Sequence, residues 1–241
     1  MWSSEDVAWL VHNYPGMRQI DAKVIEGNLN FRMLRLGVQY FVNPSEEQVL
    51  KIDDPDYIYI CDVYAIRICW DDSFPYPMAY EIGGKLAAVA NTLGKDLRDM
   101  HLFPKGGALC LASPMDLIIK LHEHFDLSKY IEEYLIPYLF AQSYYAKKQT
   151  WILGELSHGY FGLLEWLGRQ KEFTDQDAII THQVLTAYNS AADISKLVSV
   201  RCRNHKPCLC GSGKKTRNCH PDMQNGISRI RGAISRGTLK I

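Results

Sequence analysis

Four metal-type ligands stand within thirteen residues near the C-terminus of this chain of 241 residues: Cys208, Cys210, Cys219 and His220. The stretch 211–213, Gly-Ser-Gly, lies between the two pairs, and its glycines permit the sharp turn that folds the chain back. Three thiolates and one imidazole are a complete donor set for a tetrahedral zinc ion. Because such a site keeps no open position for a substrate, we predict a structural zinc module and look for catalytic chemistry elsewhere.

Two alternatives to this zinc site stay open. The same four side chains would also suit an iron ion, or they would be cysteines without a metal. Cys202 and His205 stand close by and offer alternative ligands, although the set of four is already full. Zinc on the four residues is the interpretation that we favour.

The charge balance gives no sign of a polyanionic partner for the whole chain. Lys and Arg number 27 and Asp and Glu also number 27, so no overall field attracts nucleic acid or an anionic membrane. The segment 201–240 differs, because Asp222 is its only acid. This basic segment is either a solvated tail around the metal module, which we favour, or a surface for nucleic acid.

The sequence predicts a cytoplasmic protein. Its N-terminus lacks the basic and apolar regions of a signal peptide, and no stretch is long and apolar enough for a membrane helix. Seven cysteines, three of them in a metal-type cluster, fit a reducing compartment better than a disulfide framework. Cys61 and Cys69 lie eight residues apart in a strand-like run, hence on one face, where we expect core packing.

The hydrophobic pattern predicts the α+β class. Residues 21–90 indicate an antiparallel meander. Its strand-like stretches are 23–26, 31–36, 38–42 and 57–70, with turns at 27–28 and 53–56. Later residues change to helical spacing, and strands followed by helices favour α+β over alternating α/β.

Capping residues mark the starts of the predicted helices. The expected helices are 5–14 behind Ser4, one from Ser113-Pro114, one from Ser128 with a kink at Pro137, and one from Thr174 and Asp177 to about Val200.

Cys110 is the candidate nucleophile. It lies three residues before the helix start at Ser113, where unpaired N–H groups and the helix dipole favour a thiolate. Gly106 and Gly107 allow the backbone to turn sharply and to approach closely. The competing interpretation, which these residues alone favour, is that Cys110 is a small buried hydrophobic side chain.

The segment 101–111, His-Leu-Phe-Pro-Lys-Gly-Gly-Ala-Leu-Cys-Leu, resembles the active-site segment of ubiquitin-conjugating (E2) enzymes. Upstream, residues 74–77, Phe-Pro-Tyr-Pro, resemble that family's Tyr-Pro-x-x-Pro-Pro segment. The resemblance is closer to the E2-like proteins of prokaryotic anti-phage (CBASS-type) operons, which share the residues around 107–114 and the pattern at 151–159, Trp-x-x-Gly-Glu-Leu-Ser-His-Gly. It covers about residues 1–170 and implies a four-stranded antiparallel meander flanked by helices.

This resemblance implies roles for three residues. Cys110 would form a thioester, and His101 matches a histidine that is structural in the E2 family, so we favour a loop-holding role for it over that of a base. His158 would be a proton acceptor or an orienting group near Cys110, or a loop histidine bonded to backbone carbonyls. The family's asparagine is absent, since Leu102 and Phe103 follow His101, and this leaves the donor for the isopeptide step unidentified.

The segment 208–220 resembles the SEC-C motif, Cys-x-Cys-x-Ser-Gly-x-Lys-x-x-x-Cys-Cys/His, with His in the last position. That resemblance implies a zinc-bound docking module for protein or ribosome contact. The predicted organisation is an E2-like domain over 1–170, a connecting helix over 171–200, the zinc module over 201–223 and a basic tail over 224–241.

The implied function is that of a bacterial E2-like acyltransferase in antiviral defence. Cys110 would carry a protein C-terminus as a thioester and pass it to an amine. The implied partners are a ubiquitin-like modifier or a cGAS-like nucleotidyltransferase, and an E1-like protein for activation, because no Gly-rich nucleotide loop is evident. The alternative is a non-catalytic E2-fold adaptor that docks a partner through its zinc module, and nucleic-acid binding by the basic segment is the third interpretation.

Overall fold

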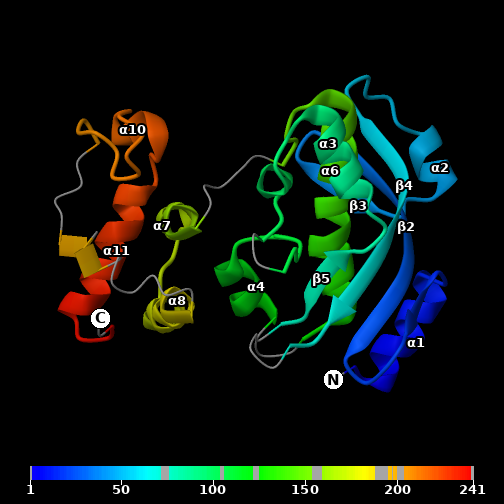
Figure 1. Ribbon diagram of the computed structural model, residues 1–241, viewed down its shortest axis with the longest axis horizontal. Helices are drawn as coiled ribbons and strands as arrows, with labels where there is room; N and C mark the ends of the chain where they lie inside the picture. The colour runs from blue at the N-terminus through cyan, green and yellow to red at the C-terminus, as the bar shows by residue number, and fades with distance from the viewer. Residues whose placement is uncertain are drawn as a thin grey trace. The chain divides into compact units, whose positions relative to one another are not determined.

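The computed structural model describes residues 2–71, 76–103, 106–121, 125–153, 159–187, 195–196, 198–199 and 204–239. The chain forms two compact units, whose elements are labelled in Figure 1. The first unit comprises Met1–Ala112 and Leu121–Gly154, and the second comprises Ser113–Lys120 and Glu155–Ile241. The chain therefore contributes one short segment to the second unit before it completes the first.

The first unit is built on a five-stranded antiparallel sheet. Its strands are β1 (Met17–Gln19), β2 (Val24–Leu36), β3 (Gln39–Val42), β4 (Ile58–Cys69) and β5 (Met78–Glu81). Their order is β1-β2-β4-β5, and β3 folds back on the C-terminal end of β2. The predicted α+β class is confirmed, whereas the prediction of four strands was one strand short.

Sequence reasoning named neither β1 nor β5 as a strand, and it divided β2 into two stretches. A pair of glycines explains the place of β1. Gly27 lies inside β2 opposite Met17, and the Asn28 N–H donates to the Gly16 carbonyl at 2.9 Å. A Cβ atom on Gly27 would lie 2.1 Å from the Gly16 oxygen, so only glycine lets the two strands run this close. The expected turn at 27–28 is therefore wrong, because the glycine serves a close backbone approach within a continuous strand.

Alternate residues of the two long strands face the core of this unit, as the period of a half-buried strand requires. The buried ones are Ile25, Leu29, Phe31 and Met33 in β2, and Ile60, Tyr64, Ile66 and Ile68 in β4. Cys61 lies on the opposite face and is exposed, so the expectation of core packing is wrong for it. Cys69, on the same face at the end of β4, is half-buried.

Helices complete the first unit. They are α1 (Ser4–Asn13), α2 (Glu46–Leu50), α3 (Lys85–Leu93), the 3-10 helix η1 (Leu97–Met100), α5 (Leu127–Lys129), the π-helix η2 (Tyr130–Leu135) and α6 (Ile136–Lys148). Ser3 caps α1, one residue before the predicted cap, and Asp126 caps α5. Pro137 lies in the first turn of α6, where a missing N–H costs little, and η2 leads directly into that turn. The meander predicted over 21–90 is interrupted by α2 and ends before α3.

The second unit is helical. Its helices include α4 (Pro114–Leu121), α7 (Gly159–Arg169), α8 (Asp175–Ala187), α10 (Thr216–Cys219) and α11 (Met223–Ser235). The predicted helix starts at Pro114 and after Thr174 are confirmed, and Thr174 and Asp177 cap α8 through reciprocal hydrogen bonds of 2.7 and 3.1 Å. The predicted end near Val200 lies outside the described residues.

The segment predicted as a basic tail, 224–241, is instead largely the helix α11. Its buried residues Met223, Ile227 and Ile230 recur at helical spacing among the basic ones and join the core of this unit. A Cβ atom on Gly226 would lie 2.0 Å from the Leu164 carbonyl oxygen, so α11 and α7 are in backbone contact. Since α7 belongs to this helical core, the first unit ends at Gly154 and not at the predicted residue 170.

Candidate functional site

The four predicted metal ligands converge in the second unit. The ligand atoms of Cys208, Cys210, Cys219 and His220 all lie within 4.8 Å of one another. Cys208 Sγ is 3.1 Å from His220 Nδ1, and Cys210 Sγ is 3.5 Å from Cys219 Sγ. Sulfur ligands of a tetrahedral ion bound at 2.3 Å would be about 3.8 Å apart, so this cluster can hold a metal ion with little movement.

A short hairpin places the first two cysteines. Pro207 pairs with Lys215, the Cys208 N–H donates to the Lys214 carbonyl at 2.7 Å, and the Thr216 N–H donates to the Lys206 carbonyl at 3.0 Å. The turn between them needs positive φ at Gly211 and Gly213, which are 81° and 72°. These glycines explain why the spacing Cys-x-Cys-Gly-Ser-Gly brings the chain back on itself. We call residues 204–221 the metal hairpin.

The other two ligands follow from α10. Cys219 ends this single turn of helix, and the His220 N–H donates to the Thr216 carbonyl at 2.8 Å, which fixes the backbone of the second ligand pair. The His220 ring lies 5.0 Å from the ring of Phe161 in α7. Because Cys208 is also part of the apolar core of this unit, the cluster joins the hairpin to the helices.

The thiols of the cluster differ in their electrostatic surroundings. Burial raises the pKa of Cys208 to about 12, while a hydrogen bond from Ser212 lowers the pKa of Cys210 to about 6. The Ser212 hydroxyl also lies 3.1 Å from Cys219 Sγ. A bound cation would favour the deprotonated form of all three thiols. His205 is exposed on the same hairpin outside the cluster, and Cys202 lies outside the described residues.

The segment carrying Cys110 is a backbone-closed loop in the first unit. The Cys110 N–H donates to the His101 carbonyl at 2.8 Å, and the Phe103 N–H donates to the Ala108 carbonyl at 2.8 Å. The Leu109 N–H donates to the carbonyl of Ala79 in β5 at 2.8 Å, which ties the loop to the sheet. We call residues 101–110 the cysteine loop, of which 104 and 105 lie outside the described residues.

His101 has the surroundings of a loop-holding residue. It caps η1 in the left-handed conformation, with φ of 53°, and its ring packs edge-on against Trp151 at 4.6 Å. The carbonyl just before it, on Met100, accepts hydrogen bonds from the Tyr138 hydroxyl at 2.9 Å and from Gln142 Nε2 at 2.6 Å. Two side chains of α6 thus hold the start of the cysteine loop.

Burial of the Cys110 thiol disfavours its ionised form. Its side chain is half-buried, and burial raises its pKa to about 11. This is the opposite of the shift that we expected from a helix N-terminus. The Ser113 hydroxyl, the expected cap of α4, is buried without a hydrogen-bond partner among the described residues. His158, with the rest of 154–158, lies outside the described residues, so its predicted role stays a prediction.

A groove of about 780 Å³ lies beside the cysteine loop in the first unit. Leu102, Gly106 and Gly107 line it from the loop, and Arg67 and Glu81 line it from β4 and β5. A Cβ atom on either glycine would meet no neighbour within 4 Å, so the space next to the loop is open. Sequence reasoning missed this groove because its walls come from segments scattered between residues 23 and 107.

Sequence reasoning also missed a polar network under α6. The Ser143 hydroxyl donates to Asp62 at 2.6 Å and lies 2.9 Å from the Tyr64 hydroxyl. Lys85 donates to the other oxygen of Asp62 at 2.5 Å. Burial alone would raise the pKa of Asp62, but the hydrogen bonds from Lys85 and Ser143 outweigh it and lower that pKa. Asp62 thereby links α6, β4 and α3.

No protein-family model, no curated protein and no solved structure matches this chain. The chemistry assigned to the metal hairpin and to the cysteine loop therefore depends on the residues of the chain itself. In the described part of the chain, no helix has the length and apolar character that a membrane span requires.

Proposed function

We propose that this chain is an E2-like acyl carrier in which Cys110 accepts the C-terminal carboxyl of a protein as a thioester and passes it to an amine. The observation that carries the proposal is the cysteine loop, which is fixed to β5 and α6 and carries the half-buried Cys110. Three other residues of this loop, Leu102, Gly106 and Gly107, line an open groove. We propose that an extended C-terminal tail binds in this groove with its carboxyl end at the loop. The residues of the loop are also those that resemble the E2 active-site segment.

The chemistry divides into two acyl transfers. First, the sulfur of Cys110 attacks the activated carboxyl carbon, the bond to the leaving group breaks, and the thiol proton passes to solvent or a base. Second, an amine attacks the thioester carbon, the C–S bond breaks, the amine loses its proton, and the thiol forms again. Because burial raises the pKa of Cys110 to about 11, little thiolate exists at neutral pH, and the first step needs a base. His158 is the residue that we propose for it.

The second step lacks the side-chain amide that the E2 family uses. Leu102 and Phe103 follow His101, and Leu102 pairs with Leu109 across the loop while the Phe103 N–H is bonded to the Ala108 carbonyl. These residues hold the loop through their backbone and offer no amide side chain to an oxyanion. We therefore assign the donor for this step to a partner protein.

The partners follow from this chemistry and from the resemblance to anti-phage operons. The protein whose C-terminal carboxyl is joined to Cys110 would be a ubiquitin-like modifier or a cGAS-like nucleotidyltransferase. An E1-like protein would activate that carboxyl in the cytoplasm. We assign a structural role to the ion of the metal hairpin and identify it as zinc, because three thiolates and an imidazole in a closed set of four are the ligands of structural zinc sites.

The test is formation of a thioester adduct. The purified chain is mixed with an E1-like protein of the same operon, ATP and the candidate modifier, and the products are separated on gels with and without reductant. We expect an adduct that reductant removes and that Cys110→Ala abolishes. Cys61→Ala is the matched control, since Cys61 is exposed on the outer face of β4. An adduct that persists in Cys110→Ala, or one lost in Cys61→Ala, would show that Cys110 is not the carrier.

The alternative function is that of a non-catalytic adaptor with the same fold. The raised pKa of Cys110 and the lack of an amide side chain at 102–103 favour it. An adaptor would form a complex with operon proteins that gel filtration detects, and it would form no adduct with any of them. Cys110→Ala would leave the complex intact in that case.

A further inference from the structure

The basic residues of the described range 204–239 fall into two groups that the sequence does not distinguish. The first group lies on α11 and at its C-cap residue, Arg236, and its side chains bond to other parts of the same unit. Arg229 donates to the Gln170 carbonyl, Arg231 donates to the Val198 carbonyl at 2.6 Å, and Arg236 forms an ion pair with Asp175 at 3.0 Å. These arginines tie the last helix to its own unit, so they are not free to serve a polyanion.

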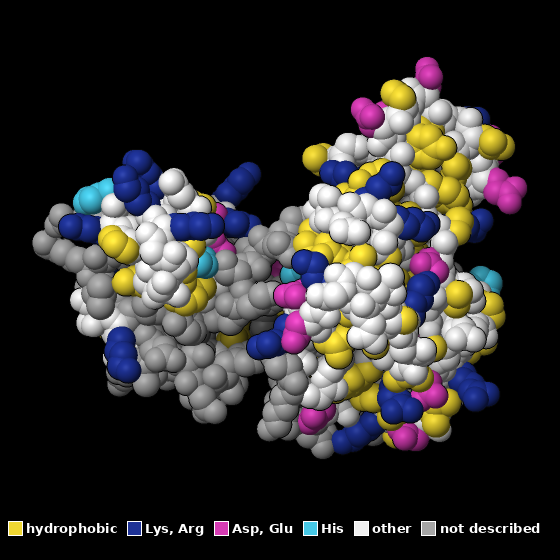
Figure 2. All heavy atoms as spheres, turned by 45° about the horizontal axis from the view of Figure 1, so that its top comes forward, with side chains coloured by type: hydrophobic (Ala, Val, Ile, Leu, Met, Phe, Trp, Pro, Cys, Tyr) yellow, Lys and Arg dark blue, Asp and Glu magenta, His cyan; other side chains and the backbone are white. Residues whose placement is uncertain are grey.

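The second group lies on the metal hairpin. Lys206, Lys214, Lys215 and Arg217 are all exposed, and none of their side chains makes an ion pair or hydrogen bond within the described part of the chain. The hairpin sequence 204–221 contains no acid, and the next one, Asp222, is paired with Arg169 at 2.8 Å. Figure 2 shows Lys and Arg side chains standing out from this unit.

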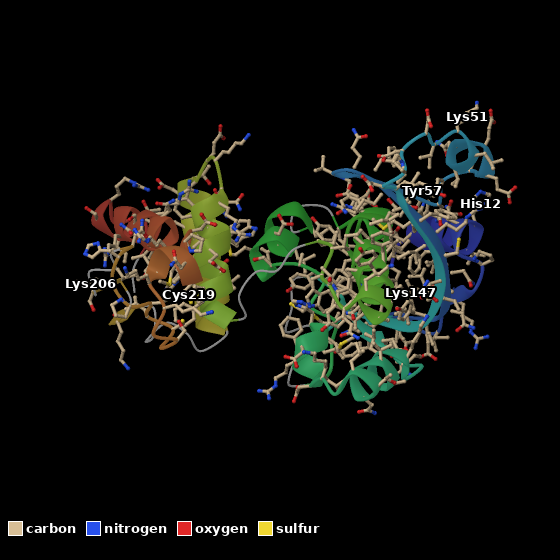
Figure 3. The ribbon with its side chains drawn as sticks, turned by 90° about the horizontal axis from the view of Figure 1, so that it is seen from above. His12, Lys51, Tyr57, Lys147, Lys206 and Cys219 are labelled. Carbon is tan, nitrogen blue, oxygen red and sulfur yellow. The ribbon has the colours of Figure 1, made fainter. Side chains whose placement is uncertain are left out.

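The backbone that carries these four side chains is fixed. The carbonyls of Lys206 and Lys214 accept the two hydrogen bonds that close the hairpin, and Lys215 forms its β-bridge with Pro207. Figure 3 labels Lys206 at the outer margin of the unit and Cys219, a ligand of the cluster, further in. A zinc ion with three thiolates would add one net negative charge, which leaves the hairpin with three net positive charges.

The hairpin offers charge without an apolar anchor. Cys208 is buried and Leu209 is half-buried, and no large hydrophobic side chain of the described hairpin is exposed. A stable protein interface needs a desolvated apolar or aromatic centre, whereas a phosphodiester backbone is bound through charge alone. We propose that the metal hairpin binds the phosphate backbone of a nucleic acid, without sequence preference, through Lys206, Lys214, Lys215 and Arg217.

The test is the salt dependence of binding to a labelled oligonucleotide, using the metal-loaded chain of 241 residues. Fluorescence anisotropy is measured with a single-stranded RNA of about 20 nucleotides and with DNA of the same sequence, over a range of KCl concentrations. The variant combines Lys214→Gln, Lys215→Gln and Arg217→Gln. We expect it to bind at least tenfold more weakly at low salt, and the slope of log K against log [KCl] to become flatter by about 2, since each lost contact with a single strand removes about 0.7.

Two further variants keep this result interpretable. Lys147→Gln with Lys148→Gln removes an equally exposed basic pair at the end of α6, and it should leave binding and slope unchanged. Lys214→Arg with Lys215→Arg keeps the charge and should keep the affinity. Metal content and circular dichroism establish that each variant holds its fold.

Three outcomes would overturn the proposal. They are equal binding by the triple variant and the original chain, binding that does not respond to salt, and displacement of the oligonucleotide by polyglutamate as effectively as by unlabelled RNA. The last would identify an acidic protein surface as the partner. RNA and DNA share the phosphate chemistry. Comparison of their affinities shows which of the two polymers the chain prefers. None of these measurements depends on Cys110, so they stand whether or not the chain is an acyl carrier.

Discussion

At the scale of single residues, metal binding depends on the side chains of the four ligands. Cys210 and Cys219 approach to 3.5 Å only because a glycine turn and one turn of helix bring them together. We predict that the purified chain binds one equivalent of zinc and that Cys219→Ser removes it, because a hydroxyl is a poor zinc ligand. Metal analysis and the absorption of a Co²⁺-substituted sample measure this. Cys61→Ser, at an exposed cysteine outside the cluster, should keep the full equivalent.

Asp62 gives a second prediction at this scale, because hydrogen bonds lower its pKa in the folded chain. A carboxylate with a lowered pKa stabilises the fold above its unfolded pKa of about 3.9, and this contribution is lost as the pH falls through the folded value. Asp62→Asn should therefore cost about 1 to 3 kcal/mol in unfolding free energy at pH 6. The difference from the original chain should shrink as the pH falls from 6 toward 3.

Urea unfolding at several pH values measures that difference. The same change at the exposed Asp53, whose side chain has no partner among the described residues, should leave the unfolding free energy nearly unaltered at each pH. If Asp62→Asn lowers the unfolding free energy by the same amount down to pH 3, the effect comes from altered packing and not from loss of the carboxylate charge.

At the scale of elements, the contact between α7 and α11 is set by glycine. A Cβ atom on Gly226 would lie 2.0 Å from the Leu164 backbone oxygen, whereas one on Gly232, in the same helix, would meet only the end of the Arg236 side chain at 3.2 Å. We predict that Gly226→Ala lowers the unfolding free energy by about 2 kcal/mol or more, because two helix backbones must separate. Gly232→Ala should stabilise by up to about 1 kcal/mol through helix propensity.

Thermal or urea unfolding of the two variants decides the point. Equal effects of the two alanines would show that α7 and α11 do not rely on close backbone contact. The comparison is matched, since both substitutions add one methyl group to the same helix.

The same elements show how far the sequence could predict this molecule. The ligand spacing was a reliable guide, because the four ligands converge as their order requires. The cap at Thr174 was predicted correctly, whereas Ser3 and Asp126 cap the helices that we expected to begin behind Ser4 and at Ser128. The strand β1 and the helix α11 were missed for one reason: Gly27 and Gly226 serve close packing against a distant segment, and such a role has no local pattern. The groove could not be predicted either, because the segments that line it come together only in the folded chain.

At the scale of the whole molecule, the two units have separate cores of different kinds. The first is a sheet covered by helices, and the second is a helical cluster that includes Met115, Leu164 and Ile227 together with the metal ligand Cys208. Binding of a metal to the folded state stabilises only the unit that contains its ligands. A bound metal would therefore stabilise the unit that contains the metal hairpin and not the unit that contains the cysteine loop.

This difference leads to a prediction for calorimetry of the intact chain. We expect two unfolding transitions, and a chelator should lower the midpoint of one of them by several degrees while the other stays in place. Asp62→Asn should move only the transition that the chelator leaves unchanged, and Gly226→Ala only the one that the chelator lowers. Transitions that shift together under all three perturbations would show that the units unfold as one cooperative body, and the metal would then stabilise the cysteine loop as well as its own hairpin.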